Sequence, residues 1–152
     1  MPPRKKEKGS PALGKKRILE VSDNCGEINA AICMDLGFEV IQVRNGDEAL
    51  RVYRRSGPFA LVLTDLIYYD PTERLPWRPP PIPGPPLKMK TGIQLTVAIR
   101  KLFAQQKIVI HTSTITQEQV PEAFSDVMIL KKPYTRKELE SVLENMLGRP
   151  NK

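Results

Sequence analysis

The sequence has little cysteine and no long apolar run, and each shortage excludes a class of protein. Only two of its 152 residues, Cys25 and Cys33, are cysteines, which excludes a disulfide scaffold and a cysteine-rich zinc site. No apolar run reaches the roughly 18 residues of a transmembrane helix, so no such helix is expected. We also find no charged start followed by an apolar segment and a cleavage site, so no secretory signal is expected. These absences predict a cytoplasmic protein with reduced thiols.

Acidic residues are also in the minority. The chain has 17 Asp and Glu against 24 Lys and Arg, which gives a net charge of +7. Six of these net charges lie in residues 1–17, so the rest of the chain is nearly neutral. Because a short basic segment with few apolar residues cannot offset its ordering entropy, we expect residues 1–15 to form a disordered arm. Such an arm could bind nucleic acid or a membrane electrostatically, and a solubilising tail is the simpler interpretation.

Proline, in contrast, is abundant and concentrated in one place. The chain has 15 prolines, and eight of them lie in residues 71–86. Neither a helix nor a central strand tolerates that density, so the segment is expected to be an extended loop. Residues 70–89 therefore form a predicted insertion in an otherwise ordinary globular sequence.

The rest of the chain alternates between two patterns. Short, mostly apolar runs, typical of buried strands, occupy residues 17–21, 38–43, 59–64, 107–111 and 127–130. Helical patterns follow at residues 23–36, 45–56, 91–102, 116–124 and 135–147, the fourth weakened by Pro121. Asn45 and Thr135 each precede a Glu by three residues, the signature of a capping box. This order predicts a doubly wound α/β fold, with a five-stranded parallel sheet between two helical layers.

Polar residues follow four of the predicted strands. Ser22 and Asp23 follow the first strand, Asp65 the third, Thr112 the fourth and Lys132 the fifth. In such folds ligands bind at the carboxyl ends of the strands, so these side chains are expected to converge there. Carboxylates bind hard cations or act as nucleophiles, and a lysine and a hydroxyl suit phosphate oxygens. The set points to phosphoryl transfer onto a carboxylate.

These residues resemble a known family, the receiver domains of response regulators in two-component signalling. The resemblance covers about residues 16–148, leaves 149–152 as a tail, and implies a flavodoxin-like (βα)5 fold. It rests on the motifs at 18–24, 61–66, 91–95, 108–113 and 130–134.

The resemblance also implies roles for individual residues. Asp65 would accept a phosphoryl group from a histidine kinase or a phosphotransfer protein, while Thr112 and Lys132 would bind that group. Asp23, Asp65 and the backbone carbonyl of Ile67 would bind Mg²⁺. The chain would then be a signalling switch rather than an enzyme with a free substrate, and phosphorylation would alter its interaction with an output protein. No helix-turn-helix follows residue 148, so no DNA-binding domain is expected.

Several positions depart from the family pattern. Ser22 replaces an acid, which should weaken Mg²⁺ binding, although its hydroxyl could still orient a water on the metal. Ile129 replaces the aromatic switch residue and, with Pro133, lies in the switch and output region, so the output face is in doubt. Glu20 is either a compensating acid or a flank residue paired with a lysine, and we expect the latter. His111 is expected to be a strand-end side chain under neighbouring helices rather than a metal ligand.

The insertion is the largest departure, because it adds about 19 residues between Asp65 and Gly92. It is either a passive insertion or a lid or partner-docking loop, and residues 83–88 fit a PxxP-plus-basic ligand. Two alternatives to phosphorylation therefore stay open. One is a pseudo-receiver that binds protein through this loop, and the other is a nucleic-acid or membrane adaptor that uses the basic arm.

Overall fold

A computed structural model describes residues 15–22, 26–77, 79–113 and 122–148. The basic arm up to residue 14, Asp23, Cys25 and the tail at 149–152 lie outside these ranges. Within them, no helix combines the length and the apolar character needed to cross a bilayer.

Five parallel strands form one sheet in the order β2-β1-β3-β4-β5. The strands are β1 (Arg17–Val21), β2 (Glu39–Val43), β3 (Leu61–Asp65), β4 (Ile108–Thr112) and β5 (Met128–Lys131). The helices are α1 (Gly26–Asp35), α2 (Gly46–Ser56), α3 (Gly92–Leu102) and α4 (Arg136–Leu147), with a 3₁₀ turn, η3 (Glu122–Phe124). The order reverses at β1, as in flavodoxin-like folds, which confirms the predicted fold class.

Three helices begin at capping side chains, and two of these, Asn45 and Thr135, are the caps that the sequence predicts. Thr91 and Thr135 each accept a hydrogen bond from the backbone of the residue three positions later and complete a capping box. Asn45 accepts a hydrogen bond from the backbone of Glu48, whose carboxylate bonds to the backbone of Arg44 rather than that of Asn45. These local bonds satisfy backbone N–H groups that a helix start leaves unpaired.

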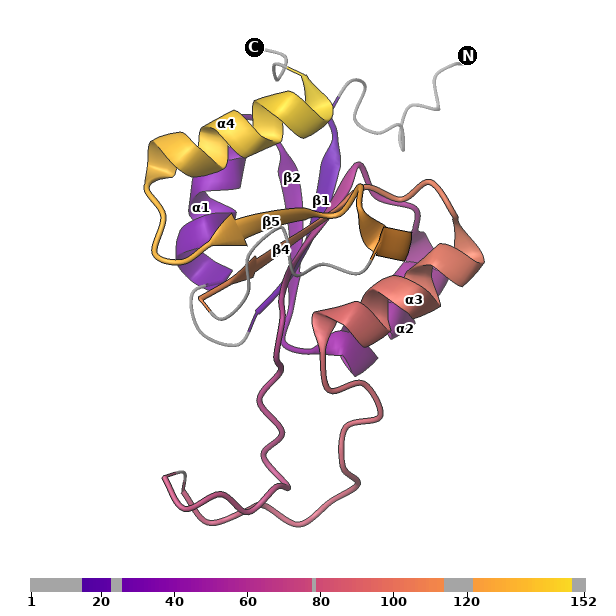
Figure 1. Cartoon of the computed structure of the whole chain (residues 1–152), viewed down its shortest axis with the longest axis vertical. Coiled ribbons are helices and arrows are strands. Elements are labelled where there is room, and N and C mark those ends of the chain that lie inside the picture. The colour runs from indigo at the N-terminus through magenta and orange to yellow at the C-terminus, as the bar shows by residue number, and fades with distance from the viewer. Residues whose placement is uncertain (1–14, 23–25, 78, 114–121, 149–152) are drawn as a thin grey trace, which may run out of the picture.

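Two apolar layers, one on each face of the sheet, hold the fold together. On one face, Leu19 and Val62 pack with side chains of α2 and α3. On the other, Ile18, Leu61 and Val109 pack with side chains of α1 and α4. Figure 1 shows the helices on both sides of the sheet. Because strand side chains alternate, Glu20, Asp65 and His111 point to the α1/α4 face, although none of them is apolar.

The predicted helix over 116–124 is only partly testable. Residues 116–121 lie outside the described ranges, and Glu122–Phe124 is a 3₁₀ turn rather than an α-helix. The described part of the chain contains four α-helices, and the predicted helix over 116–124 is contradicted only at residues 122–124.

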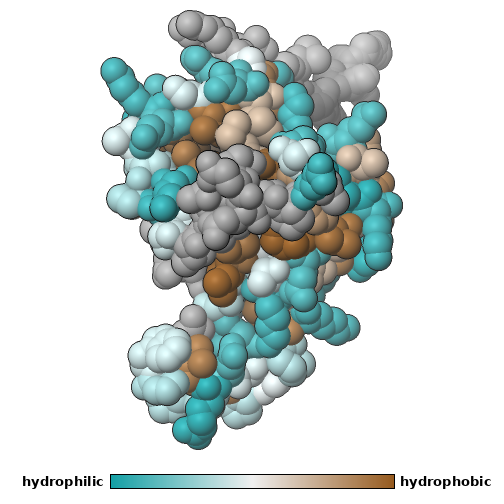
Figure 2. Space-filling model, viewed as in Figure 1, coloured by the Kyte–Doolittle hydropathy of each residue, from teal (hydrophilic) through white to brown (hydrophobic). Residues whose placement is uncertain are grey.

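The insertion leaves the sheet after β3 and returns at the start of α3. Figure 1 shows it projecting from the body of the domain, and Figure 2 shows mostly hydrophilic and pale residues near its far end. Two larger apolar side chains are exposed there, Trp77 at 76% and Ile82 at 60%. The insertion thus makes a projection of its own rather than covering the sheet.

Candidate functional site

The predicted site residues that the structure describes gather at the carboxyl edge of the sheet. Asp65 pairs in register with His111, and Thr112 pairs with Lys131, so the ends of β3, β4 and β5 lie side by side. The backbone N–H of Lys132 donates to the carbonyl of Thr112 at 2.8 Å. Ser22, Asp65 and Thr112 are all buried, whereas the side chain of Lys132 is 30% exposed.

Two side chains contact a single oxygen of Asp65. The Lys132 ammonium donates to Asp65 Oδ1 at 2.9 Å, which brings the predicted acceptor and the predicted phosphate-binding lysine together. The His111 imidazole approaches the same oxygen, with Nε2 at 3.1 Å. The carboxylate therefore lies between a cation at the surface and an imidazole inside the protein.

His111 is fully buried, as the sequence predicted, but its contact with Asp65 was not predicted. Its Nδ1 lies 2.9 Å from the Tyr134 hydroxyl, within hydrogen-bond distance. Burial lowers the pKa of His111 to about 4, with Lys132 adding to the effect and Asp65 opposing it. The ring is therefore neutral at physiological pH, despite its acidic neighbour. Tyr134, the third member of this group, was not singled out from the sequence.

The expectation that Glu20 is a flank residue paired with a lysine is wrong. Its side chain is fully buried in β1, in register with Gln42 and Leu63 on the neighbouring strands. Burial and then Asp65 raise its pKa to about 8, although the nearby side chains of Gln42 and Asn29 oppose the shift, as does Lys132. No described residue makes a well-formed hydrogen bond to either carboxylate oxygen. Glu20 is thus an acid held inside the α1/α4 layer.

The end of the insertion packs directly behind Asp65. The Gly92 N–H donates to the Leu66 carbonyl at 2.6 Å, and Ile67 forms an antiparallel bridge with Thr91. A Cβ on Gly92 would lie 2.4 Å from the Asp65 carbonyl oxygen, which no side chain tolerates. A glycine is therefore required where α3 begins against the backbone of β3.

Gly92→Ala should lower the free energy of unfolding by about 2 kcal/mol or more, because the new methyl group must displace the backbone of Asp65. Urea unfolding measures this loss. Val97→Ala, at an exposed position of the same helix, is the control. Equal stability of the two variants would contradict the tight approach.

Asp70 fixes the two sides of the insertion to each other. Its buried carboxylate accepts hydrogen bonds from the backbone and hydroxyl of Thr72 at 2.9 and 2.6 Å. It also accepts from the backbone of Leu87 at 3.0 Å and from the Lys90 ammonium at 3.1 Å. Burial alone would raise the pKa of Asp70, but these bonds hold it well below its usual range. Nothing in the sequence pattern marked this residue.

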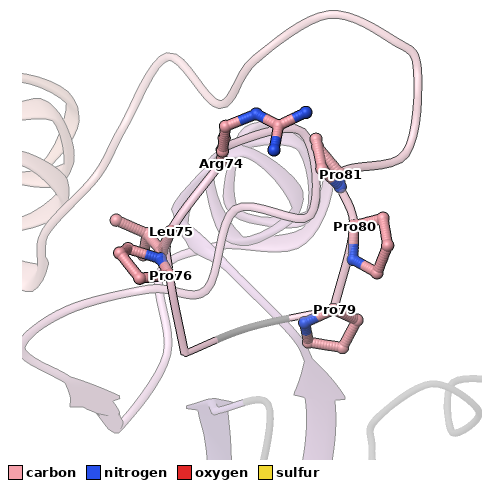
Figure 3. A pocket seen from close by; sticks show the side chains of 6 residues that line it. All are labelled: Arg74, Leu75, Pro76, Pro79, Pro80 and Pro81. Atoms are coloured by element: carbon pink, nitrogen blue, oxygen red, sulfur yellow. The ribbon is translucent and has the colours of Figure 1, made fainter.

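Beyond Asp70 the chain turns back on itself. Figure 3 shows the two sides of this turn facing each other across a hollow. The lining side chains are Arg74, Leu75, Pro76, Pro79, Pro80 and Pro81. Residues 83–88, the predicted PxxP-plus-basic segment, lie on the return path, where Asp47 accepts from the backbone of Lys88 and Met89. That segment is therefore tied to α2 at its end.

The remaining predicted residues are placed as follows. Asp23 lies outside the described residues. The Ile67 side chain is 60% exposed. Ile129 is half-buried and packs against the apolar layer that contains α2 and α3. Pro133 follows a cis peptide bond with Lys132.

The oxygen donors at this edge fit Mg²⁺ in their chemistry. Asp65 lies beside Lys132, and the buried Glu20 is near enough for Asp65 to raise its pKa. Among the described residues no group of three or more His, Cys, Asp or Glu side chains could hold a metal, and the predicted ligand Asp23 is not described. The Asp65 carboxylate would supply a divalent cation with the kind of oxygen ligand that Mg²⁺ prefers.

No family model matches the sequence, and no curated protein is significantly similar to it. Solved structures, in contrast, match it over most of its length. The chemotaxis protein CheY4 of Vibrio cholerae superposes with a TM-score of 0.65 at 20% identity, covering 88% of this chain and 99% of its own. A CheY-like receiver domain protein of Methanospirillum hungatei gives a TM-score of 0.66 at 22% identity, covering 87% and 94%.

The receiver domain of the hybrid histidine kinase CckA is a third match. It superposes with a TM-score of 0.61 at 20% identity, covering 86% of this chain and 98% of its own. Likeness at these identities establishes the fold, which is the one that the sequence motifs predicted. The chain therefore has the fold of a response-regulator receiver domain.

Proposed function

We propose that this chain is a phosphoacceptor switch in which Asp65 receives a phosphoryl group from a phosphohistidine. The donor would be a histidine kinase or a phosphotransfer protein. One observation carries the proposal: a carboxylate and an ammonium, from segments 67 residues apart, meet at 2.9 Å at the carboxyl edge of the sheet. In a doubly wound fold this edge is where ligands bind.

The chemistry follows from the charges at this edge. An Asp65 oxygen attacks phosphorus, the bond from phosphorus to the donor's imidazole nitrogen breaks, and that nitrogen keeps the electron pair. Lys132 offsets negative charge on the phosphoryl oxygens, and the Thr112 hydroxyl donates to one of them. Mg²⁺, held by Asp65, Asp23, the Ile67 carbonyl and a water on Ser22, would neutralise charge on the transferring group. Hydrolysis of the aspartyl phosphate resets the switch.

A hollow beside Lys132 gives the donor a place to approach. It has a volume of about 430 Å³. Its lining residues are Ile28, Asn29, Ser113, Lys132, Pro133 and Tyr134. Because Lys132 lines this hollow and contacts Asp65, a donor protein that docks there would bring its phosphohistidine close to Asp65.

The output of the switch involves β4 and β5. Thr112 would move toward the phosphoryl group, and Ile129 and Pro133 would carry the change to the surface that binds the output protein. Ile129 pairs with Ile110 in the sheet and packs on the side of α3, so a shift of β4 reaches it directly. The product of the reaction is then a changed protein–protein interaction.

Beryllofluoride, a mimic of the phosphoryl group, tests this function. In the presence of Mg²⁺ it should shift the amide NMR signals of Thr112, Ser113 and Lys132 in the wild type and shift none of them in Asp65→Ala. Asp126→Ala removes an exposed aspartate paired with Arg100 and should respond like the wild type. No response in the wild type, or an equal response in Asp65→Ala, would exclude phosphorylation at Asp65.

The insertion favours a second function, a phosphorylation-independent module that binds protein. Its base is fixed by the buried Asp70, while Trp77 and Ile82 are exposed at the far part. Exposed apolar side chains on a held projection suit a protein partner. A wild type that ignores beryllofluoride would favour this function. The third alternative, an adaptor that uses the basic arm, rests on residues 1–15, almost all outside the described ranges.

A further inference from the structure

Two polar side chains, His111 and Tyr134, continue inward from the proposed phosphoacceptor Asp65, in the layer that α1 and α4 cover. Tyr134 contacts His111 at 2.9 Å, and His111 contacts Asp65 Oδ1 at 3.1 Å. The imidazole is fully buried between the other two. Most buried side chains of this layer are apolar, so an imidazole in contact with Asp65 is a polar group whose role has to be explained.

The charges decide which nitrogen of His111 carries the proton. If Nδ1 carried it, the Nε2 lone pair would face a carboxylate oxygen at 3.1 Å, which is repulsive. If Tyr134 donates its hydroxyl proton to Nδ1, then Nε2 carries a hydrogen and faces Asp65 with it. The hydroxyl therefore selects the tautomer that is attractive to the acceptor.

The N–H of Nε2 does not point directly at Asp65 Oδ1, so the contact lacks the geometry of a hydrogen bond. The terminal torsion of an aspartate is soft, so we expect a turn of the carboxylate to bring Oδ1 onto the N–H direction. Both contacts to Asp65, from Lys132 and His111, fall on Oδ1. Oδ2 is then the oxygen that attacks phosphorus, and Oδ1 becomes the carbonyl oxygen of the aspartyl phosphate.

We propose that His111, oriented by Tyr134, is a positioning residue that holds Oδ1 of Asp65 and speeds the loss of the phosphoryl group from Oδ2. This inference rests on the proposed function of Asp65. In hydrolysis, water attacks phosphorus, the bond from phosphorus to Oδ2 breaks, and its electron pair stays on the carboxylate. The proton of the attacking water passes to solvent. A hydrogen-bond donor on Oδ1 binds the free carboxylate more strongly than it binds the carbonyl oxygen of the aspartyl phosphate. The donor therefore favours the step that regenerates the carboxylate.

Decay of the aspartyl phosphate tests this role. The protein is phosphorylated with radiolabelled acetyl phosphate and Mg²⁺, and the acetyl phosphate is then removed. The radiolabel that remains on the protein is followed with time. His111→Leu should decay about tenfold more slowly than the wild type, the size expected for a hydrogen bond to a charged group. Tyr134→Phe, which loses only the hydroxyl, should decay about threefold more slowly. His111→Gln keeps an N–H donor and should recover most of the wild-type rate.

Val109→Ala is the matched control, because Val109 is buried on the same face of β4, two residues before His111. It should decay at the wild-type rate. A role in packing alone predicts that the Leu and Gln variants behave alike, and this outcome would overturn the proposal. Decay of His111→Leu at the wild-type rate, or faster, would overturn it too.

The nitrogen-15 NMR signals of His111 give a readout that does not depend on phosphorylation. In the metal-free wild type they should report the Nε2–H tautomer, and an Nδ1–H tautomer would overturn the proposed contact. Failure of the proposed function is distinguishable from failure of this inference. In the first case the wild type takes up no phosphoryl group from acetyl phosphate, whereas in the second the variants are labelled and decay unchanged.

Discussion

Glu20→Gln should stabilise the folded chain more at high pH than at low pH, by about 3 kcal/mol between pH 5.5 and pH 9. Burial and the neighbouring Asp65 raise the pKa of Glu20 from 4.5 to about 8. Between these two values the folded chain keeps a proton that the unfolded chain has lost, so stability falls as pH rises through this window. The isosteric amide has no proton to lose, and the difference between variant and wild type therefore grows until about pH 8.

Urea unfolding at the two pH values measures this difference, with EDTA present so that no cation offsets the charge on Asp65. Glu144→Gln, at an exposed position of α4, is the control and should change stability little at either pH. A difference that stays constant from pH 5.5 to pH 9 would mean that Glu20 ionises at its ordinary pKa. It would also contradict the burial of Glu20 beside Asp65.

Asp70→Ala should open the insertion to proteolysis, with trypsin cleavage after the exposed Arg74 accelerated about a hundredfold. The substitution removes an acceptor of four hydrogen bonds and leaves the backbone N–H groups of Thr72 and Leu87 without their partner. The two backbone hydrogen bonds to the buried carboxylate together stabilise the closed insertion by about 3 kcal/mol. Because trypsin cleaves the open segment, the cleavage rate rises with the population of that open form. None of these bonds reaches the sheet, so the urea midpoint for global unfolding of Asp70→Ala should be close to that of the wild type.

Time courses of limited trypsin digestion measure the cleavage rate, and Asp126→Ala is the control. Because its hydrogen bonds lower the pKa of Asp70, its stabilising effect is present above the unfolded pKa of 3.8 and is lost only as pH falls through the folded value. The wild-type insertion should therefore remain closed at pH 4 when it is probed with an acid-active protease. Equal digestion of Asp70→Ala and wild type would show that the insertion is held by other contacts.

The sequence was sufficient to predict the parts of the site that depend on local pattern and on the geometry of parallel sheets. Asp65 and Lys132 each follow an apolar run, and the carboxyl ends of parallel strands must meet at one edge, so their proximity was predictable. Thr135 and Thr91 begin helices through bonds to residues only three positions away. In each case the physical cause lies within a few residues or in the direction of the strands.

Glu20 and His111 could not be understood in this way. How deeply these two side chains are buried depends on where α1 and α4 pack against the sheet. Their proximity depends on the tertiary fold, because the two residues lie 91 positions apart in the sequence. Alternation along β1 does place Glu20 on the same face as Ile18, and this was the one available signal. The role of Asp70 had no signal at all, because a lone acid in a proline-rich loop resembles any solvated residue.

The first and last residues of the insertion lie side by side, and this affects which changes of its length the fold tolerates. Tyr68 and Lys90 are joined by a backbone hydrogen bond of 3.0 Å, and Ile67 and Thr91 form a bridge next to it. The far part of the insertion, between Asp70 and Leu87, is therefore a loop whose two ends are held together, so its length can change without moving β3 or α3. Doubling such a loop costs only about 0.6 kcal/mol in closure entropy. The far part of the insertion is thus a natural grafting point, where one loop segment can be exchanged for another while the edge of the sheet at Asp65 stays unchanged.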